Sequence, residues 1–182
     1  MSAGSHLNAA VQAEAAAYRA LLRGTDAHPA LVQARDEYLA SHAETGPTSW
    51  GRMLGALKMA ILAGDGLDAV ARQAVAETAA AAESPASAYV RALAMVALGD
   101  QPDVEPMLEA GEAFALTGRA LAALAAADEP AYAAALGELA ADFEARQAHL
   151  TGVAFADTVA VLECLAARRN IAVRPASEML PG

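Results

Sequence analysis

The sequence predicts an all-α protein, either an irregular helical bundle or a short array of antiparallel α-hairpins, with about eight or nine helices. Three observations predict this class. Alanine, the residue with the highest helix propensity, makes up 53 of the 182 residues. Proline and glycine recur at intervals typical of helix starts and stops. Finally, residues 91–102 recur in similar form at residues 119–130, and internal repetition at such a period is typical of stacked helical units.

The repeated segment reads RALAMVALGDQP at residues 91–102 and RALAALAAADEP at residues 119–130, so that seven of twelve positions are identical at a spacing of 28. Proline suits a first helical turn but not a helix interior, so each Asp-x-Pro predicts the end of one helix and the start of the next. Leu108 lies 28 residues before Leu136, which predicts that the period continues past the proline. A true tetratricopeptide protein is not expected, because the tetratricopeptide repeat is 34 residues long, not 28, and its aromatic pattern is missing from this sequence.

Four helices are predicted in the first half of the chain, separated by helix-breaking residues. Gly24, the pair Gly46-Pro47 and the segment from Gly64 to Gly66 are the expected breaks. Trp50 is expected to begin the third helix, because a Thr-Ser pair precedes it and can cap it. The four helices are expected to run from Ser5 to Arg23, from His28 to the second break, from Trp50 to the third break, and from Leu67 to about Ala82.

The second half is predicted to hold the helices of the repeat and a last helix. Ser84 and Asp128 are the expected N-caps, because their side-chain oxygens can accept backbone N–H groups at a helix start. The helix after Asp128 is expected to reach Thr151 and to turn Leu150 inward, and Asn170 suits a left-handed helix end. The helices are expected from Pro85 to the Asp100 stop, between Pro102 and Gly111, from Gly111 to the Asp128 stop, from Asp128 to Thr151, and from Phe155 to Arg169.

A chain of 182 residues is long enough for one domain with a sizeable core. We expect a single all-helical domain over residues 1–182, with N-terminal helices at 5–82, the repeat-bearing helices at 85–169 and a docked, extended tail at 170–182. Because aromatic residues are only 4% of the chain, its apolar character comes largely from small side chains, which let helix backbones approach closely.

The formal net charge of −10 restricts the classes of partner. Nucleic-acid binding requires cations that replace phosphate counterions, and anionic lipid attracts basic segments, so neither a nucleic acid nor a membrane is an expected partner. The first residues lack the basic segment of a signal peptide, and Glu14 interrupts their apolar stretch. With a single cysteine, no intrachain disulfide can form, and the chain is expected to be cytoplasmic.

Motifs that carry catalysis or bind cofactors are missing from the sequence. It has no Glu-x-x-His pair, no His-Glu-x-x-His, no Cys-x-x-Cys, no glycine-rich phosphate loop and no Gly-x-Ser-x-Gly. The four histidines lack ligand spacing and are expected to be solvated or to cap helices. Cys164 is expected to be a small buried hydrophobe. The sequence therefore predicts a protein without a metal, a cofactor or enzymatic activity.

Two sets of charged residues are candidates for binding a partner. An acidic run occupies thirteen positions without a base, and it either forms a solvated helix face or is presented to a basic protein surface. Arg91 and Arg119 occupy the same repeat position, and they either pair with acids of the adjacent hairpin or line one groove for an anionic ligand. The carboxylates of the acidic run are Asp100, Asp103, Glu105, Glu109 and Glu112.

A pocket for a small molecule or lipid is expected among four aromatic residues if the protein binds such a ligand. These residues are Trp50, Tyr89, Phe114 and Phe143. An enzyme of unfamiliar type would instead require carboxylates to converge with His149 and Arg119 in one deep cleft.

The C-terminal part, residues 119–181, continues from the second repeat copy with a helix containing AYAAALGELAADFEAR and then with ADTVAVLECLAARRNIAVRPASEMLP. This succession of a small-residue helix, a short apolar extended piece and a Leu-Pro close resembles the C-terminal part of the Imm49 family of bacterial immunity proteins. The resemblance implies an all-helical protein that binds and neutralises a cognate toxin without catalysis. It assigns no functional residue.

Charge, repeat and resemblance lead to one expectation and its alternative. We expect a non-catalytic, acidic helical protein that binds a basic surface of another protein, such as a cognate toxin. The alternative is a helical bundle that binds a small molecule or a lipid. A homo-oligomer is also expected, because alanine-rich helix faces can remain free for a second chain.

Overall fold

The computed structural model describes residues 2–81, 83–171 and 173–182, and within these residues it contains nine helices and no strand. The predicted all-α class is therefore confirmed. The helices are α1 (Ala3–Leu22), α2 (His28–Thr45), α3 (Trp50–Ala63), α4 (Leu67–Ala79), α5 (Pro85–Leu98), α6 (Glu105–Leu108), α7 (Glu112–Ala125), α8 (Glu129–Ala145) and α9 (Asp157–Ala167).

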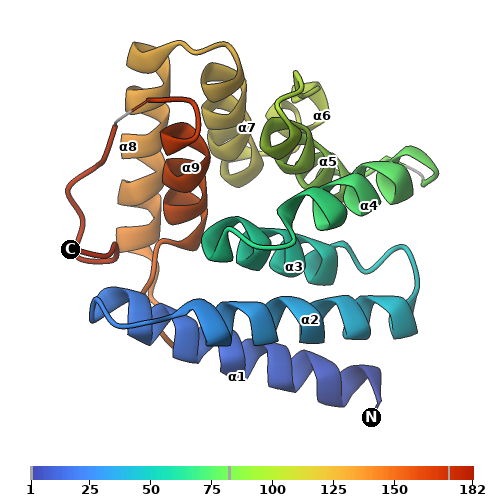
Figure 1. Cartoon of the computed structure of the whole chain (residues 1–182). Helices are drawn as coiled ribbons and strands as arrows, with labels where there is room; N and C mark the ends of the chain where they lie inside the picture. The colour runs from blue at the N-terminus through green and yellow to red at the C-terminus, as the bar shows by residue number, and fades with distance from the viewer. Residues whose placement is uncertain (1, 82, 172) are drawn as a thin grey trace.

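The helices pack largely as consecutive neighbours (Figure 1). α1 and α2 lie side by side, and α3 packs on the opposite side of α2. α4 packs against α5, and α7 packs against α8. α9 returns to contact α3, α7 and α8. Because α3 contacts α2, α4, α5 and α9, it joins the first helices to the last.

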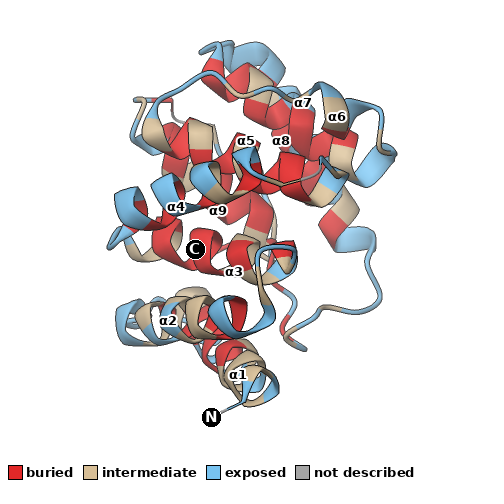
Figure 2. Cartoon of the chain, turned by 90° about the vertical axis from the view of Figure 1, so that its right-hand side faces the viewer, coloured by how far each residue is buried: buried red, intermediate tan, exposed pale blue. Residues whose placement is uncertain are grey.

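Buried residues gather in the middle of the molecule, on α3, α5, α7 and α9 (Figure 2). Many of them are alanines without exposed surface, such as Ala60 and Ala120, and their small size lets helix backbones approach closely. Gly55 gives the tightest example, because a Cβ at this position would lie 2.8 Å from the Tyr38 ring of α2. The packing of α2 on α3 therefore requires a residue without a side chain here.

Both copies of the repeat end a helix with the same backbone turn. Gly99 and Ala127 lie 28 residues apart, and each has a positive φ, of 93° and 55° respectively. The N–H groups of Asp100 and Asp128 then donate to the carbonyl five residues earlier, at 2.9 Å and 3.0 Å. This hydrogen bond around a left-handed residue identifies a Schellman turn. The repeat is thus a helix C-terminus together with its stop.

Arg169, just after α9, contacts the same repeat position in both copies. Its Nη2 donates to the carbonyl of Val96 at 2.9 Å and its Nη1 donates to the carbonyl of Leu124 at 3.4 Å. Val96 and Leu124 are equivalent residues, 28 positions apart. The last carbonyls of a helix lack an intrahelical partner, and a cation near them is stabilising. The guanidinium of Arg169 therefore binds carbonyl groups at the C-terminal ends of both α5 and α7.

The repeat does not continue past its proline, contrary to the prediction. In the second copy, Asp128 Oδ1 accepts a backbone N–H at 3.1 Å, and α8 follows at once. In the first copy, α6 starts later and has only four residues, because Gly111, with a φ of 106°, already turns the chain toward α7. Leu108 is consequently 38% exposed, whereas Leu136 is fully buried.

α8 ends at Ala145, earlier than predicted, and Leu150 is 84% exposed and not turned inward. The next residue, Arg146, has an extended backbone with φ −73° and ψ 132°. Its guanidinium pairs with Asp142 and lies 3.8 Å from the ring centroid of Phe143, so the side chain folds back along the helix. Residues 146–156 therefore connect α8 to α9 and do not extend α8.

Several other predicted features are present. Ser84 caps α5 in a capping box, and Asn170 has a left-handed φ of 58° after α9. In the tail, Ile171 and Leu180 are buried. α4 ends before residue 82, which lies outside the described residues.

Ala127 is predicted to be a site of local strain, because a Cβ disfavours the left-handed conformation that Gly99 adopts freely. We expect Ala127→Gly to raise the free energy of unfolding by about 0.5–1 kcal/mol, and Gly99→Ala to lower it by a similar amount. Urea denaturation followed by circular dichroism measures both changes. Ala126→Gly is the control, because Ala126 has a right-handed φ of −77° and should lose stability. An Ala127→Gly variant less stable than the parent would contradict the prediction.

Candidate functional site

A cavity of about 300 Å³ lies where the first helices meet the last. Its walls come from α1, α3, α5, α7, α8 and the start of α9, and residues of the connection between α8 and α9 line one side. Side chains from most of the chain's length therefore face one space. We refer to it below as the central cavity.

Glu14 of α1 is the most buried carboxylate at the central cavity, with 5% exposed surface. Tyr18 donates its hydroxyl hydrogen to Glu14 Oε1 at 2.5 Å, and Tyr38 of α2 donates to Oε2 at 2.5 Å. Burial raises the pKa of Glu14, although the two tyrosine hydrogen bonds lower it. Burial also raises the pKa of both phenols, so they keep the hydrogens that they donate. Both carboxylate oxygens are thus held by neutral donors.

Lys58 of α3 supplies a buried cation to the same cavity. Its Nζ donates to Asp157 Oδ2 at 2.7 Å and to Thr158 Oγ1 at 3.0 Å, both on α9. Burial lowers the pKa of Lys58, but Asp157, Tyr89 and Glu14 together outweigh burial, so the pKa is raised. Lys58 is therefore an ammonium ion paired with Asp157. Tyr89 of α5 adds a contact, with its hydroxyl 3.4 Å from Thr158 Oγ1.

Aromatic rings form much of the remaining wall. Five of the chain's eight aromatic residues line the central cavity, including all three phenylalanines. Tyr18 and Phe155 stack on each other with ring centroids 4.3 Å apart. The central cavity thus joins apolar ring surface to a small number of charged groups, a combination typical of ligand sites.

Three of the four residues predicted to form a pocket come together in the structure. Tyr89, Phe114 and Phe143 line the central cavity. Trp50 does not, and it lines a separate open groove of about 780 Å³. Trp50 stands at the start of α3, whereas Lys58, about two helical turns further along, is the α3 residue that reaches the central cavity.

An enzyme was expected to need carboxylates, His149 and Arg119 in one cleft, and the structure brings only some of these residues together. His149 lines the central cavity with Glu14 and Asp157, but Arg119 does not. The arginine found at this cavity is Arg146, which was not predicted there. His149 and Arg146 both lie in the connection between α8 and α9, so their position depends on that segment and not on a helix.

The acidic run is exposed at all five carboxylates. Within the part of the chain that the structure describes, only Glu112 of these five pairs with a cation, at 3.2 Å from Arg119. Arg119 also pairs with Glu138 of α8 at 3.1 Å, which is the contact with an adjacent hairpin considered from the sequence. Arg91 lies in a separate, smaller cavity beside Glu83. The two arginines therefore do not line one groove.

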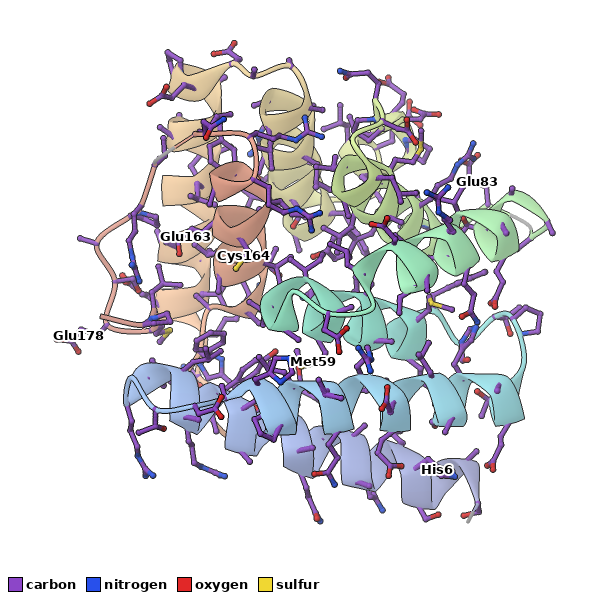
Figure 3. All side chains as sticks on the ribbon, viewed as in Figure 1. His6, Met59, Glu83, Glu163, Cys164 and Glu178 are labelled. Carbon is purple, nitrogen blue, oxygen red and sulfur yellow. The ribbon has the colours of Figure 1, made fainter. Side chains whose placement is uncertain are left out.

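His42 contradicts the expectation that the histidines are solvated or cap helices. It is 3% exposed, with Nδ1 2.8 Å from Ser49 Oγ and Nε2 2.6 Å from a Glu77 carboxylate oxygen, and it thereby ties α2 to α4. His6, on α1 (Figure 3), lies 2.5 Å from a Glu37 carboxylate oxygen of α2. Both histidines have structural partners.

Cys164 lies beside Glu163 on α9 (Figure 3) and is half-buried. Burial raises the pKa of its thiol, and the neighbouring Glu163 charge raises it further. Because the thiolate is the reactive form, this environment makes Cys164 a poor nucleophile.

The described residues contain no group of three or more histidine, cysteine or carboxylate side chains placed to hold a metal ion. In the same residue ranges, every helix is too short or too polar to cross a membrane.

The chain matches no protein-family model, no curated protein and no solved structure. The fold and site define an all-α protein with a mixed aromatic and charged cavity.

Sequence reasoning missed the charged wall of the central cavity, namely Glu14, Lys58 and Asp157. A signal for two of them was present. Glu14 lies in the apolar face of the first helix, and Lys58 is surrounded by apolar residues in the segment MLGALKMAIL. Charged residues are almost never fully buried unless they are paired, so a charge on an apolar helix face indicates a buried partner.

Breaking the Lys58–Asp157 pair is expected to destabilise the fold. Lys58→Met should lower the free energy of unfolding by about 3–5 kcal/mol, because it leaves the Asp157 carboxylate without its cation. The double variant Lys58→Met/Asp157→Asn should lower the free energy of unfolding by less than Lys58→Met alone, because it removes both charges. Guanidinium denaturation measures these changes, with Arg119→Met, at an exposed pair, as a control that should change stability little. Additive losses in the double variant would contradict the coupling.

Proposed function

We propose that the protein binds a small molecule in the central cavity. One observation carries the proposal: five of the eight aromatic residues of a chain that is 4% aromatic line this space, next to the buried charges of Glu14 and Lys58. Burying charged groups costs free energy, and ligand sites are places where such groups recur beside apolar walls. The combination supports binding of a ligand that has both an apolar and a polar part.

The volume of the central cavity supports a small ligand. About 300 Å³ lies at the lower end of the range for ligand sites, which suits a single ring with a short substituent better than the acyl chain of a lipid. Residues 146–148 are exposed where they line or border the cavity, so a ligand can enter beside the connection between α8 and α9.

A thermal-shift screen tests this proposal. Small single-ring compounds with cationic, neutral and anionic substituents are the probes. A compound present at a hundred times its Kd should stabilise the fold by about 2.7 kcal/mol, which for a chain of this size raises Tm by about 5–10 °C. If no compound shifts Tm, the proposal is wrong.

Ala113→Phe is the matched variant for this screen. Ala113 is exposed and lines the central cavity, so a ring at this position should occupy the cavity mouth without disturbing the buried core. We expect the variant to keep the far-ultraviolet circular dichroism spectrum of the parent and to lose the ligand-induced rise in Tm. A full ligand response in Ala113→Phe would place the bound compound elsewhere.

We propose protein binding through the acidic run as a second candidate function. It is favoured by the exposure of all five carboxylates, four of which have no cationic partner among the described residues. The resemblance of residues 119–181 to the Imm49 family supports a toxin as the partner. A surface of unpaired carboxylates would speed association with a basic protein.

Co-expression with toxins encoded beside its gene tests this second candidate. The protein should co-purify with one of them and protect the cells. A variant with Asp103, Glu105 and Glu109 changed to the corresponding amides should then associate more slowly at low salt, because electrostatic steering is lost. Co-purification with none, and protection against none, would exclude the immunity role.

A further inference from the structure

The charges around the central cavity do not balance. Lys58 is neutralised by Asp157, at 2.7 Å. Arg146, at the exposed side, is neutralised by Asp142, with Nη2 2.5 Å and Nε 3.1 Å from the same carboxylate oxygen. Glu14 remains, and its two hydrogen-bond partners are neutral phenols. Among the described carboxylates that line the cavity, Glu14 is therefore the one without an ion-pair partner.

The buried position of Glu14 strengthens the electrostatic attraction between its carboxylate and a cation. Glu14 is 5% exposed, and opposite charges attract much more strongly in such an environment than in water. Burial has the largest effect on the pKa of Glu14 and raises it, and of the two nearby charges Asp157 raises and Lys58 lowers this pKa. A negative ligand group would be repelled at this end, whereas a positive one would supply the missing partner.

The aromatic walls favour the same kind of ligand. The face of an aromatic ring attracts cations. Two rings of the central cavity already have a cation of the protein beside them: the Lys58 Nζ is 5.7 Å from the centroid of Tyr89, and the Arg146 Cζ is 3.8 Å from the centroid of Phe143. The ring surface for a ligand cation is therefore supplied by Phe114 and by the stacked pair Tyr18 and Phe155.

We infer that the ligand of the central cavity is a small organic cation, an ammonium compound whose charge pairs with Glu14 while its apolar part packs on the rings. The inference rests on the proposed small-molecule function and adds the chemical class of the ligand. The available volume limits the class to molecules of about the size of one ring with a short amine substituent.

Three probes of nearly equal size and shape test the inference: benzylammonium, benzyl alcohol and benzoate, with charges of plus one, zero and minus one. Isothermal titration calorimetry at pH 7 and low salt should give benzylammonium an affinity about tenfold above that of benzyl alcohol. Benzoate should bind most weakly. If benzyl alcohol or benzoate binds as tightly as benzylammonium, the ligand class is wrong although the small-molecule function stands. If none of the three binds, the inference fails, and the proposed function falls only if the wider thermal-shift screen is also negative.

Glu14→Gln tests the contribution of the Glu14 charge to binding, because glutamine has nearly the same size and shape but no charge. It should lower the affinity for benzylammonium about tenfold and leave that for benzyl alcohol unchanged. Glu129→Gln is the matched control, because it removes the same charge at the exposed start of α8, away from Phe143. It should leave both affinities unchanged. Equal losses for both probes in Glu14→Gln would overturn the role of the charge.

Phe114→Leu provides a second variant if Glu14→Gln does not fold. Phe114 is only partly buried, and leucine keeps an apolar side chain there while removing the ring. The affinity for benzylammonium should then fall more than that for benzyl alcohol, by about threefold. An equal fall for both probes would contradict the attraction between the ring surface and the charge of the cationic probe.

Discussion

The ion pair between Lys58 and Asp157 is the interaction on which the geometry of the central cavity depends. It joins α3 to α9 across 99 positions of sequence, and removing either partner would leave a poorly solvated charge. Because α3 also packs against α2, α4 and α5, the pair positions the last helix relative to the first half of the chain. Thr158 and Tyr89 extend the contact to α5. The walls of the central cavity are held together by charges that are themselves part of those walls.

Local signals predicted the helix ends, because caps act through backbone groups within a few residues. Ser84, Asp128 and Asn170 are found in the expected roles for this reason. The repeat was predictable only as far as its turn, where the left-handed residue and the Asp N–H belong to one local motif. Past the proline of each repeat copy, the length of the next helix depends on the helix that packs against it. There α6 packs on α7 at Gly118, where a Cβ would lie 3.3 Å from that of Met107, and the period stops.

The candidate site was predictable only on its apolar side. Phe114 and Phe143 lie on apolar helix stripes, and such stripes face the core whichever helices pack together. Glu14 and Lys58 interrupt similar stripes. Tyr18, one turn from Glu14 on the same helix, is a local partner, but the sequence does not show which other groups would satisfy the two charges. Those other partners lie 24 positions away for the bond from Tyr38 to Glu14 and 99 positions away for the ion pair. Tertiary packing selects these partners, so one helix considered alone carries no information about them.

The composition of the chain explains why rings and charges gather at one place. Alanine-rich helices pack well where they run side by side, as α2 and α3 do at Gly55. α8 instead runs steeply to α1 and α2 (Figure 1), and small side chains cannot fill the space between helices that diverge. An empty space there would cost free energy in proportion to its volume. Rings from α1, α5, α7 and α8 fill part of it and leave about 300 Å³ beside Glu14. A ligand in this space would supply both the lost packing contacts and the missing charge partner, so the two proposals for this cavity share one physical origin.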